Sequence, residues 1–183
     1  METSAAKNGQ RGSYAEMLDN DLGKLFTHQL KDTYFAETAI VKALPKMMKA
    51  AQSDELKQGF RKHLKQTEEH VARLESVFKM IAIKAEGTPC EAIKGIIKEG
   101  DEVAEEFGGT LAGDAGLAAS AQAVEHYEIA RYGTLKAWAR ELGLDDAVDL
   151  FEATEEEEIF TDQSLTELAA TLNSTAMDAH KSS

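Results

Sequence analysis

The apolar residues of this 183-residue chain recur at three- and four-residue intervals over almost its whole length. That spacing is typical of amphipathic helices, because an α-helix has 3.6 residues per turn. It predicts five helices, at about residues 22–48, 54–86, 90–107, 114–143 and 145–172. The four longer helices, roughly 40–48 Å long at ~1.5 Å per residue, are expected to pack as an antiparallel four-helix bundle. We therefore predict an all-α fold of two helical hairpins, with the shorter helix crossing one end of the bundle to link them.

Local signals set the expected helix boundaries. Pro45 lies inside the first apolar pattern and should kink the helix or end it near Leu44. Thr88 and Glu91 form a capping box, with Pro89 at the first helical position, which predicts the start of the short helix.

The ends of the chain and the loop after the short helix show no helical pattern. Residues 1–18 and 175–183 are expected to be flexible tails on either side of one domain, residues 19–174. After the Gly108-Gly109 break, a small flexible loop is expected before the next helix begins near Asp114.

Charge, hydropathy and cysteine content argue against several classes of protein. The net charge of −13 argues against a nucleic-acid-binding protein, whose binding face is normally basic. No apolar stretch approaches the ~20 residues that a membrane span needs. The N-terminal region lacks the apolar core of a secretory signal, and the single cysteine, Cys90, fits a reducing compartment. A cytoplasmic protein without membrane or nucleic-acid partners is expected.

The acidic residues are concentrated in the second half of the chain. Residues 1–85 carry 14 basic and 11 acidic side chains, whereas residues 86–183 carry 6 and 22. A solvated acidic surface explains most of them. Some, however, occupy core-facing helix positions: Glu37, Glu125, Glu128, Glu158 and Asp162, with Gln66 and His70 at the matching level of the second helix.

A carboxylate on a core-facing stripe is costly unless it is paired, neutralised or bound to a metal. Few lysines or arginines share these faces, so a buried salt bridge explains only part of the pattern. Oxygen ligands with an occasional imidazole suit iron or manganese, and bundles build dinuclear centres from carboxylates on all four helices. The two hairpins also align under a shift of 91 residues, which places Glu37 on Glu128.

Four segments carry a resemblance to a known family: LFTHQLKDTYFAETAIVKALPKM, HLKQTEEHVARLESVF, AQAVEHYEIARYGTLKAWARELG and TEEEEIFTDQSLTELA. Together they resemble the YciE/YciF family of ferritin-like proteins over about residues 20–172. The resemblance implies a ferritin-like bundle with an extra helix, commonly a homodimer, from bacteria and linked with stress responses. It assigns no reaction, so whether the chain is an enzyme stays open.

The ferritin-like pattern implies one glutamate on each leading helix of a hairpin, here Glu37 and Glu128, with Glu125 as an alternative. It also implies a Glu-x-x-His pair on each of the other two helices, and this sequence has neither. Gln66 and His70 stand on one of these helices, and Glu158 and Asp162 on the other. These seven residues are the predicted ligands of one or two iron or manganese ions. The alternative is a non-enzymatic, dimeric stress or interaction protein with a degenerate metal site.

Overall fold

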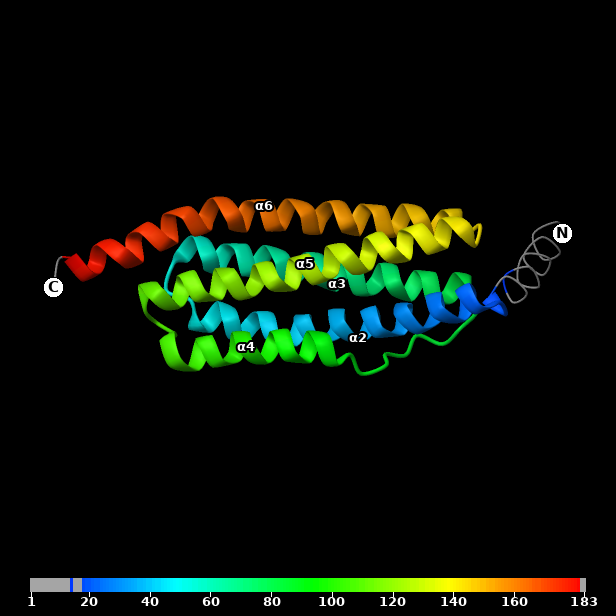
Figure 1. The fold of residues 1–183 in the computed structure, drawn as a ribbon, viewed down its shortest axis with the longest axis horizontal. Helices are drawn as coiled ribbons and strands as arrows, with labels where there is room; N and C mark the ends of the chain where they lie inside the picture. The colour runs from blue at the N-terminus through cyan, green and yellow to red at the C-terminus, as the bar shows by residue number, and fades with distance from the viewer. Residues whose placement is uncertain (1–13, 15–17, 182–183) are drawn as a thin grey trace.

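The computed structural model describes residue 14 and residues 18–181, and the described part contains five helices and no strand. They are α2 (Asp21–Ala50), α3 (Asp54–Met80), α4 (Glu91–Phe107), α5 (Leu111–Glu141) and α6 (Asp145–Lys181). Figure 1 shows them as one elongated bundle. None of the described helices combines the length and the apolar character needed to cross a membrane.

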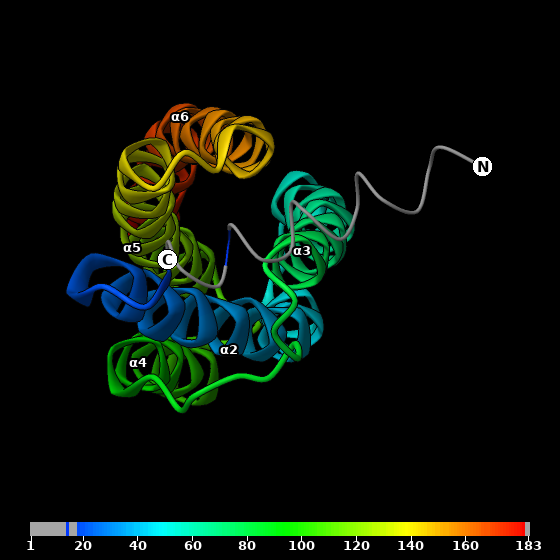
Figure 2. The same cartoon turned by 90° about the vertical axis from the view of Figure 1, so that its right-hand side faces the viewer.

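The helices α2, α3, α5 and α6 form a four-helix bundle in which each helix runs antiparallel to its neighbours (Figures 1 and 2). The predicted all-α bundle of two hairpins, α2–α3 and α5–α6, is confirmed. The prediction that the short helix crosses an end of the bundle is wrong. The segment 81–90 first runs back along α2, and α4 then lies along the outside of the bundle against α2 and α5.

The core has three layers along the bundle axis. An apolar cluster around Phe26, Leu74 and Phe151 fills one end, and another around Leu44 and Leu117 fills the other. Between them lie buried polar side chains, here called the polar layer: Thr33, Glu37, His63, Thr67, His70, Glu125, Glu128, Thr154 and Glu158. Every bundle helix contributes to all three layers, so the apolar ends fix the polar residues at one level.

Two helix ends differ from the sequence prediction. The helix α2 continues through Pro45 to Ala50, and Pro45 is exposed, so the hydrogen bond it lacks is lost at the solvent side. The helix α3 ends at Met80 instead of near residue 86. Ala82 there has a φ of 57°, and the Ile83 N–H donates to the Phe78 carbonyl at 3.0 Å. This is a Schellman motif with alanine where glycine is usual, which is why no sequence signal marked the end.

The starts of α4 and α5 also differ. The capping residue of α4 is Cys90, not Thr88. The N–H of Thr88 instead donates a hydrogen bond to the Lys31 carbonyl. The helix α5 begins at Leu111 with Thr110 as its cap, so no flexible loop extends to Asp114.

The last helix is longer than predicted. The apolar pattern predicts an end near Leu172, but α6 continues to Lys181. Residues 175–181 of the predicted C-terminal tail are therefore helical. The predicted N-terminal tail lies almost wholly outside the described residues.

The left-handed conformation of Ala82 predicts a stabilising substitution. Ala82→Gly removes the steric cost of the positive φ and is expected to raise the free energy of unfolding by about 0.5–1 kcal/mol. The measurement is urea unfolding followed by circular dichroism. Ala85→Gly, in the extended part of the same segment, is the control and should lower that free energy. Equal effects of the two substitutions would contradict the assignment.

Candidate metal centre

Six side chains from all four bundle helices meet inside the polar layer, and we call them the Glu/His cluster. They are Glu37 of α2, His63 and His70 of α3, Glu125 and Glu128 of α5, and Glu158 of α6. None is more than 4% exposed to solvent. The helical repeat places them there, because each lies three, four or seven residues from a buried apolar residue of its own helix.

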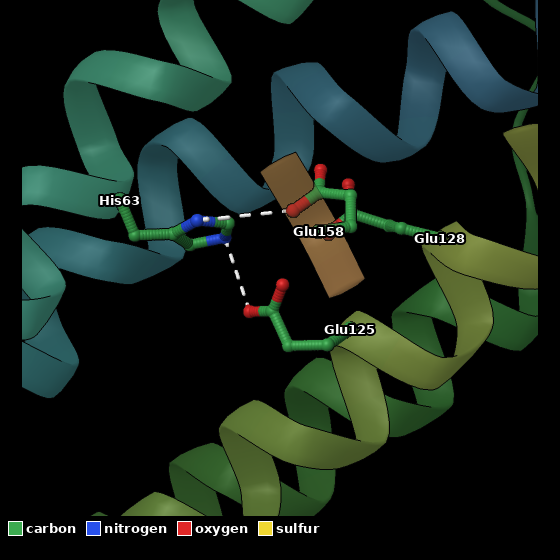
Figure 3. Close-up of side chains that lie close together, drawn as sticks. All are labelled: His63, Glu125, Glu128 and Glu158. Atoms are coloured by element: carbon green, nitrogen blue, oxygen red, sulfur yellow. Dashed lines mark ion pairs between the residues drawn. The ribbon is translucent and has the colours of Figure 1, made fainter. Parts of the chain in front are cut away.

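One half of the cluster contains His63, Glu125, Glu128 and Glu158, whose side chains point toward one another (Figure 3). Each offers one nitrogen or oxygen atom, and these four atoms lie within 4.8 Å of one another. Nε2 of His63 is 3.2 Å from Oε1 of Glu125, and its Nδ1 is 3.9 Å from Oε2 of Glu158. This spacing is suitable for one metal ion between them.

The other half contains Glu37, His70 and Glu158, so Glu158 belongs to both halves. Nδ1 of His70 is 3.0 Å from Oε1 of Glu158 and 3.6 Å from Oε1 of Glu37. The Tyr132 hydroxyl donates a hydrogen bond to Oε1 of Glu37. Tyr132 therefore fixes the carboxylate of Glu37 from the apolar end of the site.

Residues around the cluster orient His70. Its Nε2 is 2.8 Å from Oε2 of Glu157, and Arg73 holds the same carboxylate through two hydrogen bonds of 2.8 and 2.9 Å. Arg73 also donates to the Thr154 hydroxyl at 3.1 Å. Such partners of a second ring nitrogen fix the orientation of a ligating imidazole. Here they turn Nδ1 of His70 toward the carboxylates.

The cluster holds nearly all of the unsatisfied polar atoms of the described core. With the exception of Nε of Arg131, every buried side-chain nitrogen or oxygen without a hydrogen-bond partner in the described residues belongs to the cluster. Both oxygens of Glu128, both oxygens of Glu158 and both ring nitrogens of His63 are in this state. Buried polar atoms in proteins are normally satisfied, and this concentration of unsatisfied nitrogen and oxygen atoms could hold a metal ion.

Burial and mutual repulsion change the protonation of the cluster. Burial raises the pKa of Glu125 and Glu128 well above the usual carboxyl value, and the negative charge of Glu158 raises both further. Burial alone would lower the pKa of His70, but the carboxylates of Glu158 and Glu37 outweigh it and raise that pKa to about 10. Without metal, His70 is therefore an imidazolium at neutral pH, and Glu125 and Glu128 tend to hold protons.

The structure brings together five of the seven predicted ligands: Glu37, His70, Glu125, Glu128 and Glu158. Gln66 and Asp162 are not in the cluster. Gln66 is half-buried and lies beside it, between α3 and α6. Asp162 is 3.1 Å from Nε2 of His126 and 3.4 Å from Nε2 of Gln122.

The sequence interpretation missed two functional candidates. His63 lies seven residues, or two helical turns, before His70 on the same face of α3, and this spacing was the signal that could have identified it. Glu157, which is not among the predicted site residues, contacts His70 and Arg73. No spacing rule indicated this, because Glu157 is adjacent to Glu158 and points to a different face.

The geometry also explains the missing Glu-x-x-His pairs. The 91-residue shift aligns Thr67 with Glu158 and His70 with Thr161. The helix α3 thus keeps the histidine of such a pair as Thr67-x-x-His70, and α6 keeps the glutamate as Glu158-x-x-Thr161. The additional imidazole of His63 lies on the side of Glu125. The resulting donor set, four carboxylates and two imidazoles, fits a hard or borderline divalent metal.

The fold and the cluster define an all-helical bundle protein with a buried glutamate–histidine centre. The family described as "Domain of unknown function (DUF892)" matches residues 21–177, and the chain belongs to this family. It is 42% identical to Protein YciF of Escherichia coli K12 over 146 residues, which are 79% of this chain and 88% of that protein. The resemblance to YciF-type proteins noted in the sequence is confirmed.

Solved structures show the same fold. The crystal structure of the E. coli stress protein YciF matches with a TM-score of 0.81 and 39% identity, covering 85% of this chain and 98% of that chain. YcfI of Rhodopseudomonas palustris matches with a TM-score of 0.78 and 47% identity, covering 80% of this chain and 94% of that chain. A protein of Xanthomonas campestris shares the fold at 16% identity, with a TM-score of 0.68.

The raised pKa of Glu128 predicts that replacing this residue by glutamine stabilises the metal-free protein, and more so at higher pH. Because the folded state raises the pKa of Glu128, its contribution to stability is present at pH below about 4.5 and is lost as the pH rises through the raised value. Glu128→Gln removes this ionisation. At pH 8 the free energy of unfolding of the metal-free variant is expected to be about 1–2 kcal/mol higher than that of metal-free wild type. This difference should shrink toward pH 5.

The measurement is urea unfolding of chelator-treated protein at both pH values. Glu156→Gln, an exposed change on α6, is the control and should leave the free energy of unfolding unchanged at both. A Glu128→Gln variant less stable than wild type at pH 8 would show that the Glu128 carboxylate is satisfied in the fold.

Proposed function

We propose that this chain binds one or two divalent ions of iron or manganese at the centre of its bundle, as a bacterial stress-response protein. The observation that carries the proposal is the convergence of unsatisfied carboxylate and imidazole atoms in the dry polar layer. A cation there would compensate the repulsion that arises when Glu125, Glu128 and Glu158 are all ionised, and no described lysine or arginine forms an ion pair with them. The similarity to the stress protein YciF supports the physiological setting.

Two ions are compatible with the cluster, because its two halves share Glu158. His63, Glu125, Glu128 and Glu158 would hold one ion, and Glu37, His70 and Glu158 the other. Bound iron would supply redox chemistry toward oxygen or peroxide. The chain itself contributes the hydrogen bond of Tyr132 to Glu37 and the Glu157 contact that orients His70.

Metal content tests the proposal directly. Protein purified from cells supplemented with iron, manganese and zinc is expected to carry close to one or two equivalents of metal, measured by mass spectrometry. Glu128→Ala and Glu158→Ala should lose most of it, because each removes a cluster ligand, whereas Glu156→Ala should retain it. Less than about a tenth of an equivalent in wild type, unchanged in the variants, contradicts metal binding.

A second candidate is a non-enzymatic stress or interaction protein whose site has degenerated. The observation that favours it is the threonine at each half of the split pair, Thr67 and Thr161. The melting temperature separates the two candidates, since a metal bound only by the folded state stabilises it by about 2.7 kcal/mol at 100 times its Kd. A melting temperature that drops with chelator and recovers with iron or manganese supports a working site. No change with either supports the degenerate one.

The titration of the ligands predicts how metal affinity depends on pH. Glu125 and Glu128 hold protons because burial and the charge of Glu158 raise their pKa, and His70 is protonated up to about pH 10. A metal must displace these protons, so the apparent affinity is expected to rise between pH 6 and 8 with net proton release. Calorimetric titration in two buffers of different ionisation enthalpy measures the released protons. Affinity that falls with rising pH would contradict the assigned protonation.

The resemblance also leads us to propose a cytoplasmic homodimer without membrane or nucleic-acid partners. The net charge of −13 supports the absence of a nucleic-acid partner. Light scattering of the purified protein measures its mass in solution.

A further inference from the structure

Side chains of α3 and α6 pair across one part of the contact between these helices, and a cavity opens at another part. We call this contact the α3–α6 seam; it is formed by Gly59, Lys62, Gln66 and Arg73 of α3 and by Glu157, Phe160, Thr161 and Ser164 of α6. The Arg73–Glu157 pair closes the seam near His70. Further along, Nζ of Lys62 lies 4.6 Å from the ring centre of Phe160. Beyond this contact the residues at the opening include the small Gly59 and Ser164.

A cavity of about 80 Å³ opens at this part of the seam and reaches the Glu/His cluster. Its walls are mainly apolar and come from three helices: Phe60 of α3, Ala121 of α5, and Leu165 and Leu168 of α6. Its lining also includes His63 and Glu125, both members of the cluster. The cavity therefore joins the surface to one half of the candidate metal centre.

Two buried residues that line the cavity, His63 and Glu125, have polar atoms without a hydrogen-bond partner. His63 is 4% exposed, and neither of its ring nitrogens has a hydrogen-bond partner. Glu125 is 1% exposed, and its Oε2 is also without a partner. Unsatisfied atoms beside an apolar space are typical of a site for a ligand with an apolar body.

Gly59 keeps the outer part of the cavity open. It lies inside α3, where glycine costs about 1 kcal/mol relative to alanine. Packing does not require it, since a Cβ added there meets no atom within 4 Å. Gly59 shares a helix face with Lys62 and Gln66, three and seven residues later, and all three line the cavity. A side chain at Gly59 would therefore project toward α6 across the opening.

We propose that this cavity is an access port and binding site for a small uncharged molecule that reaches His63 and Glu125. Apolar cavities of about 150 Å³ hold benzene, so this smaller one accommodates about two to four non-hydrogen atoms. The apolar walls disfavour an ion, because an unpaired charge is costly away from water. Gln66, predicted from the sequence as a metal ligand, is here a residue of the port. Delivery to a metal rests on the proposed function, but occupancy of the cavity does not.

Xenon tests the cavity without any metal. Crystals of the metal-free, full-length protein under xenon pressure are expected to show xenon between Phe60, Ala121 and Leu165. Gly59→Leu should abolish this peak, and Ser164→Leu should abolish it from the opposite side of the opening. Gly95→Leu is the matched control, because Gly95 is also an exposed helical glycine with open space but lies on α4, away from the cavity. No xenon in wild type, or a full peak in both cavity variants, overturns the proposal.

The charge preference is tested with two probes of equal size. Ethanol added to the metal-free protein is expected to give nuclear Overhauser contacts from its methyl group to Phe60 and Leu165, and to shift the His63 ring signals. Formate should give neither effect. Equal binding of formate, or no contact with ethanol, overturns the choice of an uncharged ligand. Because no metal is present, a failed metal-content experiment would leave these results unaffected, so the two proposals fail separately.

Discussion

The burial of four carboxyl groups at one level of the bundle is the constraint on which this structure depends. Four glutamates lie in the middle of the bundle, where water cannot screen their charge. Two apolar clusters, one on each side, supply the burial that holds the helices together. The bundle is thus most stable at its two ends and most costly at its centre, the reverse of a uniform core. An apolar core interrupted by buried polar groups is expected at a binding site, where functional residues lower the stability of the fold.

The chain limits this cost with its own cations and hydrogen bonds. The imidazolium of His70 lies between Glu158 and Glu37, and Tyr132 donates to Glu37. These contacts all serve one half of the cluster. The half with His63, Glu125 and Glu128 has no comparable compensation, since burial lowers the pKa of His63 and keeps its ring neutral. The side chains that compensate buried charge are therefore distributed unequally between the two halves of the Glu/His cluster.

Much of this arrangement could be predicted from the sequence, because helical periodicity is a local property. The inward direction of Glu37, Glu128 and Glu158 follows from their distance to core residues on the same helix. Gln66 is only half-buried because it lies one position from the buried Thr67, and one residue turns a helix by about 100°. Asp162 keeps the helical spacing from Glu158, but its carboxylate contacts His126 and Gln122.

Other features depend on contacts between distant segments and left no local pattern. The path of the 81–90 segment decides that α4 packs along the bundle, and a hydrogen bond from Thr88 to Lys31 helps to hold that path. The role of Glu157 depends on Arg73, 84 residues earlier in the chain.

Asp114 couples the two hairpins at the end of the bundle away from the Ala82 turn. Its carboxylate, 1% exposed, accepts hydrogen bonds of 2.6 and 2.7 Å from the backbone N–H groups of Gln52 and Ser53, in the turn between α2 and α3. A residue of the second hairpin thus completes the turn of the first. These two backbone N–H groups of the first hairpin acquire their partner only when α5 has docked, which favours cooperative folding of the two halves.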